Sequence, residues 1–267
     1  MKKLSAVCCT YGRFKYVERV INFYLQQTYP YKELILFNTD TESPYIDEPC
    51  VLAAYGILIV NNSIDMVTKQ PYTNVGAIRR DALKFASGEL TVTWDDDDSF
   101  MPYFMQQAVD RMEQTGLPSF KPEKSFFYSG GNLRLVMNTM EASVVASMEK
   151  VREYGYLLET GKEGLGWYTK MRDNKELDEH DKYYIPSYCF DWNTTFNNEY
   201  VHRQSGDIDN TDNFNNHKSA SKDAVNDRRI AIYDEEKMRE IYQPYFDFIR
   251  NNEAEFPQEL IEKYFKC

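Results

Sequence analysis

The sequence predicts an α/β fold in which a mostly parallel sheet is flanked by helices. Two observations support this prediction. Apolar segments of strand length alternate along the chain with segments whose apolar residues recur at helical spacing. Polar residues also follow several predicted strands at the point where each strand ends. Because ligands bind at the carboxyl ends of the strands in such sheets, we expect the functional site at this edge.

Residues 1–94 contain four predicted strands and two predicted helices. The strands fall at residues 4–10, 33–37, 55–60 and 90–94. The second helix covers residues 76–86, and the first is indicated by apolar side chains at helical spacing, namely Val17, Val20, Ile21, Tyr24 and Leu25. The resulting β-α-β-β-α-β order is typical of a doubly wound, Rossmann-like sheet.

The remainder of the chain is predicted to add helices, a strand pair and a C-terminal helical extension. Helices are expected from Phe104 onward and over residues 141–154. Strands at residues 125–128 and 133–137 are joined through two glycines, which is a hairpin signal. Residues 202–229 are expected to form a mobile loop. A last helix carries an apolar face of Met238, Ile241, Tyr242, Tyr245 and Ile249.

Four consecutive acids, residues 95–98, follow the strand at 90–94, whose alternating apolar side chains predict that it is half-buried. Adjacent carboxylates repel one another and are costly to bury. One interpretation is a solvated acidic turn in which Asp98 or Ser99 caps the next helix. The other is a site for a divalent cation such as Mg²⁺ or Mn²⁺, because these ions prefer oxygen ligands. Polar residues also end the neighbouring strands, at Thr10, Asn38, Asp40 and Asn61.

Composition narrows the class of protein. Aromatic residues make up 15% of the 267 residues, which supplies many stacking surfaces for sugars or bases. The formal net charge of -11 disfavours broad, non-specific binding to nucleic acid, because phosphates would be repelled. The five cysteines form no CxxC pair, so reduced thiols and a cytoplasmic location are expected. No apolar run approaches the ~20 residues of a membrane span.

Five segments lie in an order that is informative as a set. They are SAVCCTYGR at 5–13, LQQTYPYKELILFN at 25–38, NVGAIRRDALKFASGE at 74–89, WDDDD at 94–98, and the stretch 188–206 with Trp192-Asn193 and HRQSG at 202–206. Over residues 4–206 this order resembles the GT-A glycosyltransferases, specifically the inverting, family 2-like group, with WDDDD in the place of the family's DxD motif. The resemblance implies a single GT-A catalytic domain. Its nucleotide-sugar half would cover about 1–100, its acceptor half about 101–206, and a mobile loop with C-terminal helices 207–267.

The implied activity is metal-dependent, inverting transfer of a sugar from a nucleotide-sugar donor, with a UDP-sugar as the family-level expectation. Several side chains would then face the nucleotide. Thr10, Tyr11 and Arg13 would cradle the base, and Asn38 or Asp40 would bond its polar edge. Arg79 would reach the base or a phosphate. Asp95 and Asp96 would lie on the nucleotide side of the acidic run.

The resemblance also implies metal ligands and a general base. Asp97 would ligate Mn²⁺ or Mg²⁺ directly, Asp95 would reach the ribose or the metal through water, and His202 would be a late ligand. Glu163 would deprotonate the acceptor hydroxyl, with Glu159 as its rival. Trp167 and Trp192 would stack on a sugar face, although buried packing is an equal alternative for both.

Two other classes of function stay open at this point. One is a nucleotidyltransferase on a similar sheet, and the other is a non-catalytic carbohydrate-binding protein. The acceptor is also open: a soluble glycan, a lipid-linked glycan, a protein or a hydroxylated DNA base would each supply a hydroxyl group.

Overall fold

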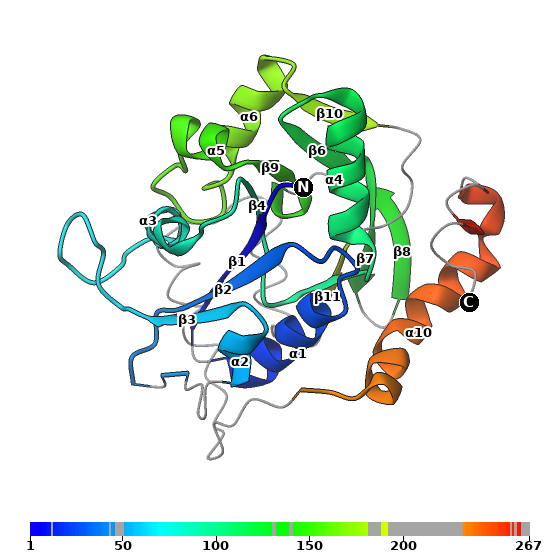
Figure 1. The fold of residues 1–267 in the computed structure, drawn as a ribbon, viewed down its shortest axis with the longest axis horizontal. Helices are drawn as coiled ribbons and strands as arrows, with labels where there is room; N and C mark the ends of the chain where they lie inside the picture. The colour runs from blue at the N-terminus through cyan, green and yellow to red at the C-terminus, as the bar shows by residue number, and fades with distance from the viewer. Residues whose placement is uncertain are drawn as a thin grey trace.

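The computed structural model describes residues 1–11, 13–42, 44–45, 51–129, 132–138, 141–180, 188–191, 232–256, 258 and 261–262. Its centre is a seven-stranded sheet in the order β10-β6-β9-β4-β1-β2-β3 (Figure 1). The strands are β1 (Leu4–Thr10), β2 (Lys32–Asn38), β3 (Ile57–Asn61), β4 (Leu90–Thr93), β6 (Ser119–Pro122), β9 (Val145–Ser147) and β10 (Leu177–His180). Only β9 runs antiparallel to its neighbours, so the predicted mostly parallel α/β fold is confirmed.

Helices cover both faces of this sheet. They are α1 (Phe14–Leu25), α2 (Val51–Ala54), α3 (Val75–Ala82), α4 (Phe104–Thr115), α5 (Met148–Tyr154), α6 (Leu165–Asp173) and α10 (Glu235–Asn251), with short 3₁₀ turns η1 (Leu83–Phe85), η2 (Glu141–Ser143) and η3 (Glu253–Glu255). Alternate side chains of a strand point to opposite faces. Leu4 and Ala6 of β1 therefore enter a core shared with α1, α4 and α10, whereas Val7 enters a second core shared with α3, α5 and α6.

A smaller sheet lies beside the main one, in the order β5-β11-β7-β8. It is built from β5 (Asp98–Phe100), β7 (Lys124–Ser129), β8 (Asn132–Met137) and β11 (Tyr188–Asp191). β7 and β8 pair antiparallel, which confirms the predicted hairpin. The predicted C-terminal helix is also confirmed: in Figure 1, α10 lies along this side of the molecule, next to β8. Its buried residues are Met238, Tyr242, Tyr245 and Ile249.

The single helix predicted over residues 141–154 is wrong. The structure divides this stretch into η2, β9 and α5. β9 inserts between β4 and β6 and bonds to both of them. Val145 and Ala146 are fully buried on the two faces of the sheet. Apolar residues that are buried on both faces of a strand lose the alternation that distinguishes strands from helices.

One further expectation needs correction, and two elements were missed. β4 is not half-buried: Thr91 and Thr93 are buried as well as its apolar residues, because helices cover both faces of this central strand. The Gly- and charge-rich stretch after residue 157 contains α6 and β10, neither of which was predicted. The mobile loop expected at 202–229 lies outside the described residues.

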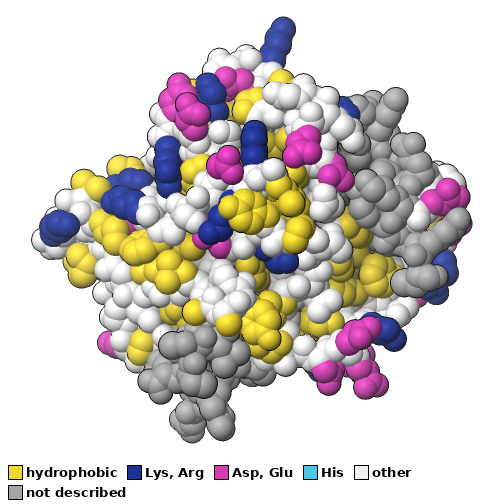
Figure 2. Space-filling model, in the orientation of Figure 1, with side chains coloured by type: hydrophobic (Ala, Val, Ile, Leu, Met, Phe, Trp, Pro, Cys, Tyr) yellow, Lys and Arg dark blue, Asp and Glu magenta, His cyan; other side chains and the backbone are white. Residues whose placement is uncertain are grey.

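On the face that Figure 2 shows, Lys and Arg side chains are interspersed with Asp and Glu. Within the described part of the chain, no helix is both long and apolar enough to cross a membrane.

Candidate functional site

The acidic run connects the two sheets. Asp95 follows β4 of the main sheet, and Asp98 opens β5 of the smaller sheet. Trp94 and Phe100 stack at 3.6 Å between ring centroids, which fixes both ends of the run. Asp96, Asp97 and Asp98 are buried, and Tyr103 rather than Asp98 or Ser99 precedes α4. The interpretation of a solvated, helix-capping turn is therefore wrong.

Asp96 is held by residues from the end of β1. Thr10 Oγ1 donates a hydrogen bond of 2.8 Å to Asp96 Oδ2, and the guanidinium of Arg13 forms an ion pair of 2.5 Å with Oδ1. The Tyr45 hydroxyl lies 2.9 Å from Thr10 Oγ1 and accepts the Arg13 backbone N–H. All these groups are buried. Thr10 and Arg13 therefore position an acid of the run, rather than presenting free polar atoms to a ligand.

Arg79 links the first acid of the run to the expected general base. Asn74 caps α3 by accepting the Ala77 N–H, which starts the helix that carries Arg79. Arg79 Nη2 lies 3.1 Å from Asp95 Oδ1, and its Nε lies 3.2 Å from Glu163 Oε1. The structure thus brings together three predicted site residues from α3, the end of β4 and the turn before α6.

The site carries more negative than positive charge. Six carboxylates gather here, those of residues 95–98, Glu141 and Glu163, and the guanidinium groups of Arg13, Arg19 and Arg79 lie near them. Burial raises the pKa of Asp97 to about 7, Arg13 lowers it, and the neighbouring acids Asp96 and Asp95 raise it. Burial also raises the pKa of Asp98, and one of its oxygens, Oδ1, is buried without a hydrogen-bond partner.

These carboxylates fit a divalent cation chemically. Asp98 offers a carboxylate oxygen without a hydrogen-bond partner, and such oxygens are the ligands that Mg²⁺ and Mn²⁺ prefer. Among the described residues, no group of three or more His, Cys, Asp or Glu side chains is already arranged to hold a metal. His202, the expected late ligand, lies outside the described residues.

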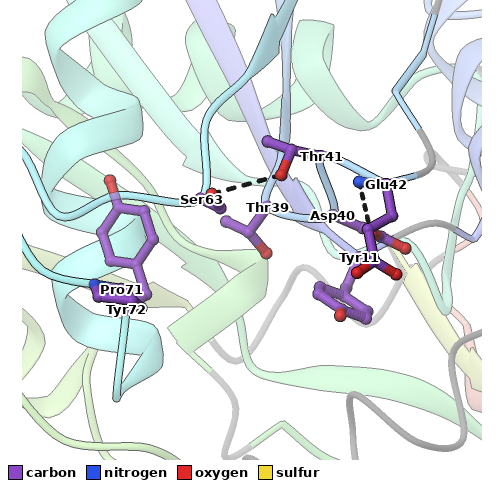
Figure 3. Close-up of a pocket in the computed structure, with 8 residues that line it drawn as sticks. All are labelled: Tyr11, Thr39, Asp40, Thr41, Glu42, Ser63, Pro71 and Tyr72. Atoms are coloured by element: carbon purple, nitrogen blue, oxygen red, sulfur yellow. Dashed lines mark hydrogen bonds between the residues drawn. The ribbon is translucent and has the colours of Figure 1, made fainter.

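A pocket of about 140 Å³ lies beside the ends of β1 and β2 (Figure 3). Its lining includes Tyr11, Asp40 and Tyr72. Asp40 is 2% exposed; its Oδ1 accepts the Glu42 N–H, and its Oδ2 is buried without a partner. The side-chain amide of Asn38 instead makes hydrogen bonds within the protein, donating to Asp40 O and to Asn61 Oδ1 at 2.9 Å each. Of the two alternatives for bonding the base, the geometry favours Asp40.

The other residues expected at the site are the rival base Glu159 and the two tryptophans expected to stack on a sugar. Glu159 has an exposed side chain, and its carbonyl accepts the Gly76 N–H of α3 at 2.9 Å. Trp167 is 2% exposed and packs in the second core beside Tyr156 and Tyr168, so its ring is not available to stack on a sugar. Trp192 lies outside the described residues.

Two residues of the site were missed from the sequence. Tyr45 joins the Thr10 and Arg13 network, and Glu141 of η2 lies near Arg79 and Glu163. Glu141 was assigned to a predicted helix, and no motif in the sequence marks either residue. Because β9 runs antiparallel to β4, η2 just before β9 lies at the carboxyl end of β4, and this pairing brings Glu141 to the carboxyl edge of the sheet.

Comparisons with known proteins agree with this geometry. Residues 5–123 match the family model "Glycosyl transferase family 2". No curated protein matches the sequence. The structure is similar to the 1-349 fragment of S. aureus TarS in complex with UDP-GlcNAc, with a TM-score of 0.55 and 14% identity over 97% of this chain and 82% of that one. The chain spans 50% of the longer S. aureus TarS structure, at a TM-score of 0.52 and 15% identity over 97% of this chain.

Two further solved structures share the fold. Glucosyl-3-phosphoglycerate synthase from Mycobacterium tuberculosis, in complex with Mn²⁺, UDP and glucosyl-3-phosphoglycerate, aligns with a TM-score of 0.54 and 14% identity over 84% of this chain and 82% of that one. The mannosyltransferase PcManGT from Pyrobaculum calidifontis, in complex with GDP-Man and Mn²⁺, aligns with a TM-score of 0.52 and 13% identity over 83% of this chain and 69% of that one. At these identities the likeness establishes the GT-A fold.

Proposed function

We propose that this chain is a metal-dependent, inverting glycosyltransferase that uses a nucleotide-sugar donor. Its residues 5–123 match the model of glycosyl transferase family 2, and a UDP-sugar is the first donor to test. The observation that carries this proposal is the buried acidic run at the carboxyl edge of the sheet, linked by Arg79 to Glu163. The acceptor is a hydroxyl group of a glycan or another biomolecule.

The nucleotide would lie along the ends of β1 and β2. Asp40 and Tyr11 both line the pocket there, and the Asp40 carboxylate has one oxygen, Oδ2, without a hydrogen-bond partner in the described chain. Thr10 and Arg13 keep Asp96 fixed behind it, so the acidic run has the same shape before and after the donor binds.

Asp97 and Asp95, with His202 from outside the described residues, would hold Mn²⁺ or Mg²⁺. Bound there, such an ion would neutralise negative charge on the leaving diphosphate. Arg79 orients Asp95 through their 3.1 Å ion pair. A carboxylate near Arg79 then takes the proton of the acceptor hydroxyl, on the side away from the diphosphate.

The test is thermal stability of the purified protein with UDP, GDP, UDP-GlcNAc, UDP-glucose and GDP-mannose, each with Mn²⁺ and with EDTA. A ligand at a hundred times its Kd stabilises a protein by about 2.7 kcal/mol, so a shift is easy to measure. We expect one nucleotide to stabilise the protein only with Mn²⁺. Asp97→Asn should abolish this effect, whereas Asp173→Asn, an exposed acid on α6, should keep it.

Product analysis separates this function from its alternatives. Release of a nucleoside diphosphate from the donor supports glycosyl transfer. Release of pyrophosphate would instead identify a nucleotidyltransferase. Sugar binding that depends on neither nucleotide nor metal would identify a carbohydrate-binding protein.

A further inference from the structure

We propose that Glu141, not Glu163, is the general base of the reaction, and that Gly164 provides the space in which the Glu141 side chain lies. This inference rests on the proposed glycosyl transfer and assigns its proton acceptor. It replaces the expectation, drawn from the family resemblance, that Glu163 takes the acceptor's proton.

Access distinguishes the two carboxylates. Glu163 is 5% exposed; one oxygen is paired with Arg79, and the other, Oε2, is completely buried without a partner. The Glu163 carboxylate is therefore already engaged by Arg79 on one side and enclosed by protein on the other. Glu141 is only half-buried, so its side chain is more exposed than that of Glu163. Apart from its own backbone N–H, its carboxylate has no hydrogen-bond or ion-pair partner in the described chain.

Gly164 explains how a side chain from η2 comes to lie at the start of α6. A Cβ at position 164 would meet Glu141 Cγ at 2.1 Å and Oε1 at 2.6 Å. The backbone does not require glycine there, because its φ of -73° and ψ of -21° suit any residue. The volume over residue 164 is therefore filled by the Glu141 side chain, which sets its carboxylate beside Glu163.

The surrounding charges suit this assignment. Burial raises the pKa of Glu141 to about 7, Arg79 lowers it, and the acids Glu163 and Asp95 raise it. Tyr156 is the other ionisable group whose pKa responds to Glu141. A base with a pKa near the working pH is the efficient kind. Glu163 is a positioning residue in this arrangement, since it fixes the guanidinium of Arg79.

The step balances without any further reagent. The acceptor oxygen forms a bond to the anomeric carbon while the bond between that carbon and the diphosphate oxygen breaks. The nucleoside diphosphate leaves with the electron pair of the broken bond. The hydroxyl proton passes to the Glu141 carboxylate, and the anomeric configuration inverts.

The experiment measures nucleoside diphosphate release from the donor that stabilises the protein with Mn²⁺, with water as the acceptor. We expect Glu141→Gln to slow release by about 100-fold to 10,000-fold, the usual contribution of a general base. Its thermal stabilisation by UDP or GDP with Mn²⁺ should equal that of the unmodified protein. Glu149→Gln, an exposed acid on α5, is the matched control and should change neither quantity.

Azide separates a missing base from a damaged site, because azide is an anion that attacks the anomeric carbon without losing a proton. We expect azide to raise the rate of nucleoside diphosphate release by the Glu141→Gln variant at least tenfold, with a glycosyl azide as product. Glu163→Gln should be slower than the unmodified protein but not restored by azide, because its defect lies in the position of Arg79.

Gly164→Ala tests the space directly, since a methyl group there displaces the Glu141 carboxylate while leaving it in the protein. This variant should release the nucleoside diphosphate slowly, and azide should restore the rate. Combined with Glu141→Gln, it should lower the rate no further than Glu141→Gln does alone. A Glu141→Gln rate within threefold of normal, or azide rescue confined to Glu163→Gln, would overturn the assignment and leave the proposed function standing. An unmodified protein that neither binds nor cleaves any donor would overturn the function itself.

Discussion

Asp40 carries a carboxylate oxygen that is buried with no partner of its own. Burying an acceptor without a hydrogen bond costs stability, and such groups are common where a ligand completes the structure. Asn38 shapes this position by donating to the Asp40 carbonyl and accepting the Asp40 N–H at 3.0 Å. The amide of Asn38 thus builds the pocket that Asp40 lines.

Asp40→Asn should weaken binding of the stabilising nucleotide about tenfold, because a hydrogen bond to a charged acceptor is worth about 1.5 kcal/mol or more. Titration calorimetry of the nucleotide with Mn²⁺ measures this change. Glu235→Gln, an exposed acid on α10, is the control and should bind as tightly as the unmodified protein. Unchanged affinity in Asp40→Asn would place the nucleotide elsewhere.

Among the elements, α3 depends on an acid near its end. Asp81 is fully buried and accepts hydrogen bonds from the Met66 N–H at 2.7 Å, Tyr72 at 2.9 Å and Lys84 at 2.7 Å. Arg80 adds an ion pair of 3.0 Å. One carboxylate therefore ties the helix to the loop that follows β3, and this loop supplies Tyr72 to the nucleotide pocket.

Asp81→Asn should destabilise the protein by about 3 kcal/mol at neutral pH, as expected when one partner of a buried ion pair is removed. Burial alone would raise the pKa of Asp81, but the hydrogen bonds from Arg80, Lys84 and Met66 lower it below its usual value. A lowered folded-state pKa stabilises the fold at every pH above the unfolded-state value of about 3.9, and this stabilisation disappears as the pH falls further.

Urea unfolding at pH 7, 5 and 3 checks this prediction. The difference between Asp81→Asn and the unmodified protein should be constant from pH 7 to 5 and smaller at pH 3. Asp173→Asn, with its exposed ion pair, should differ little from the unmodified protein at any of these values. A difference that grows on acidification would contradict the lowered pKa.

At the scale of the whole molecule, α10 joins the C-terminal part of the described chain to the main core. Tyr242 is 3% exposed, packs against Phe23 of α1 at 5.6 Å between ring centroids, and donates a hydrogen bond of 3.0 Å to the Phe100 carbonyl. Phe100 stacks on Trp94 at the other end of the acidic run. The C-terminal helix thus supports the turn that carries the acids.

Tyr242→Ala should lower the free energy of unfolding by about 4 kcal/mol, because it empties a large buried site. Tyr242→Phe should cost only about 1 kcal/mol, the value of one hydrogen bond. Denaturant unfolding measures both, and Gln243→Ala on the exposed side of α10 is the control. If Tyr242→Ala unfolded like the control, α10 would not be part of the cooperative core.

The sequence predicted β1, β2, α1, α3, the hairpin and α10 because their apolar residues repeat with a clear local period. It could not predict β9, whose apolar residues face both cores and show no alternation. α6 was missed for a related reason, since its turn begins at glycines and charged residues that are typical of a loop.

For the candidate site, the sequence by itself supplied the acids, Arg79 and Glu163 as predicted site residues, because they fall within or beside short segments that resemble the family's motifs. Tertiary structure alone decided which side chains meet. The antiparallel pairing of β9 with β4 places η2 so that Glu141 lies against Gly164, and packing around α6 encloses Trp167 in the core. Such contacts join residues that are distant along the chain. A local sequence pattern reports the period of one element, and it carries no information on which distant side chains the folded core brings together.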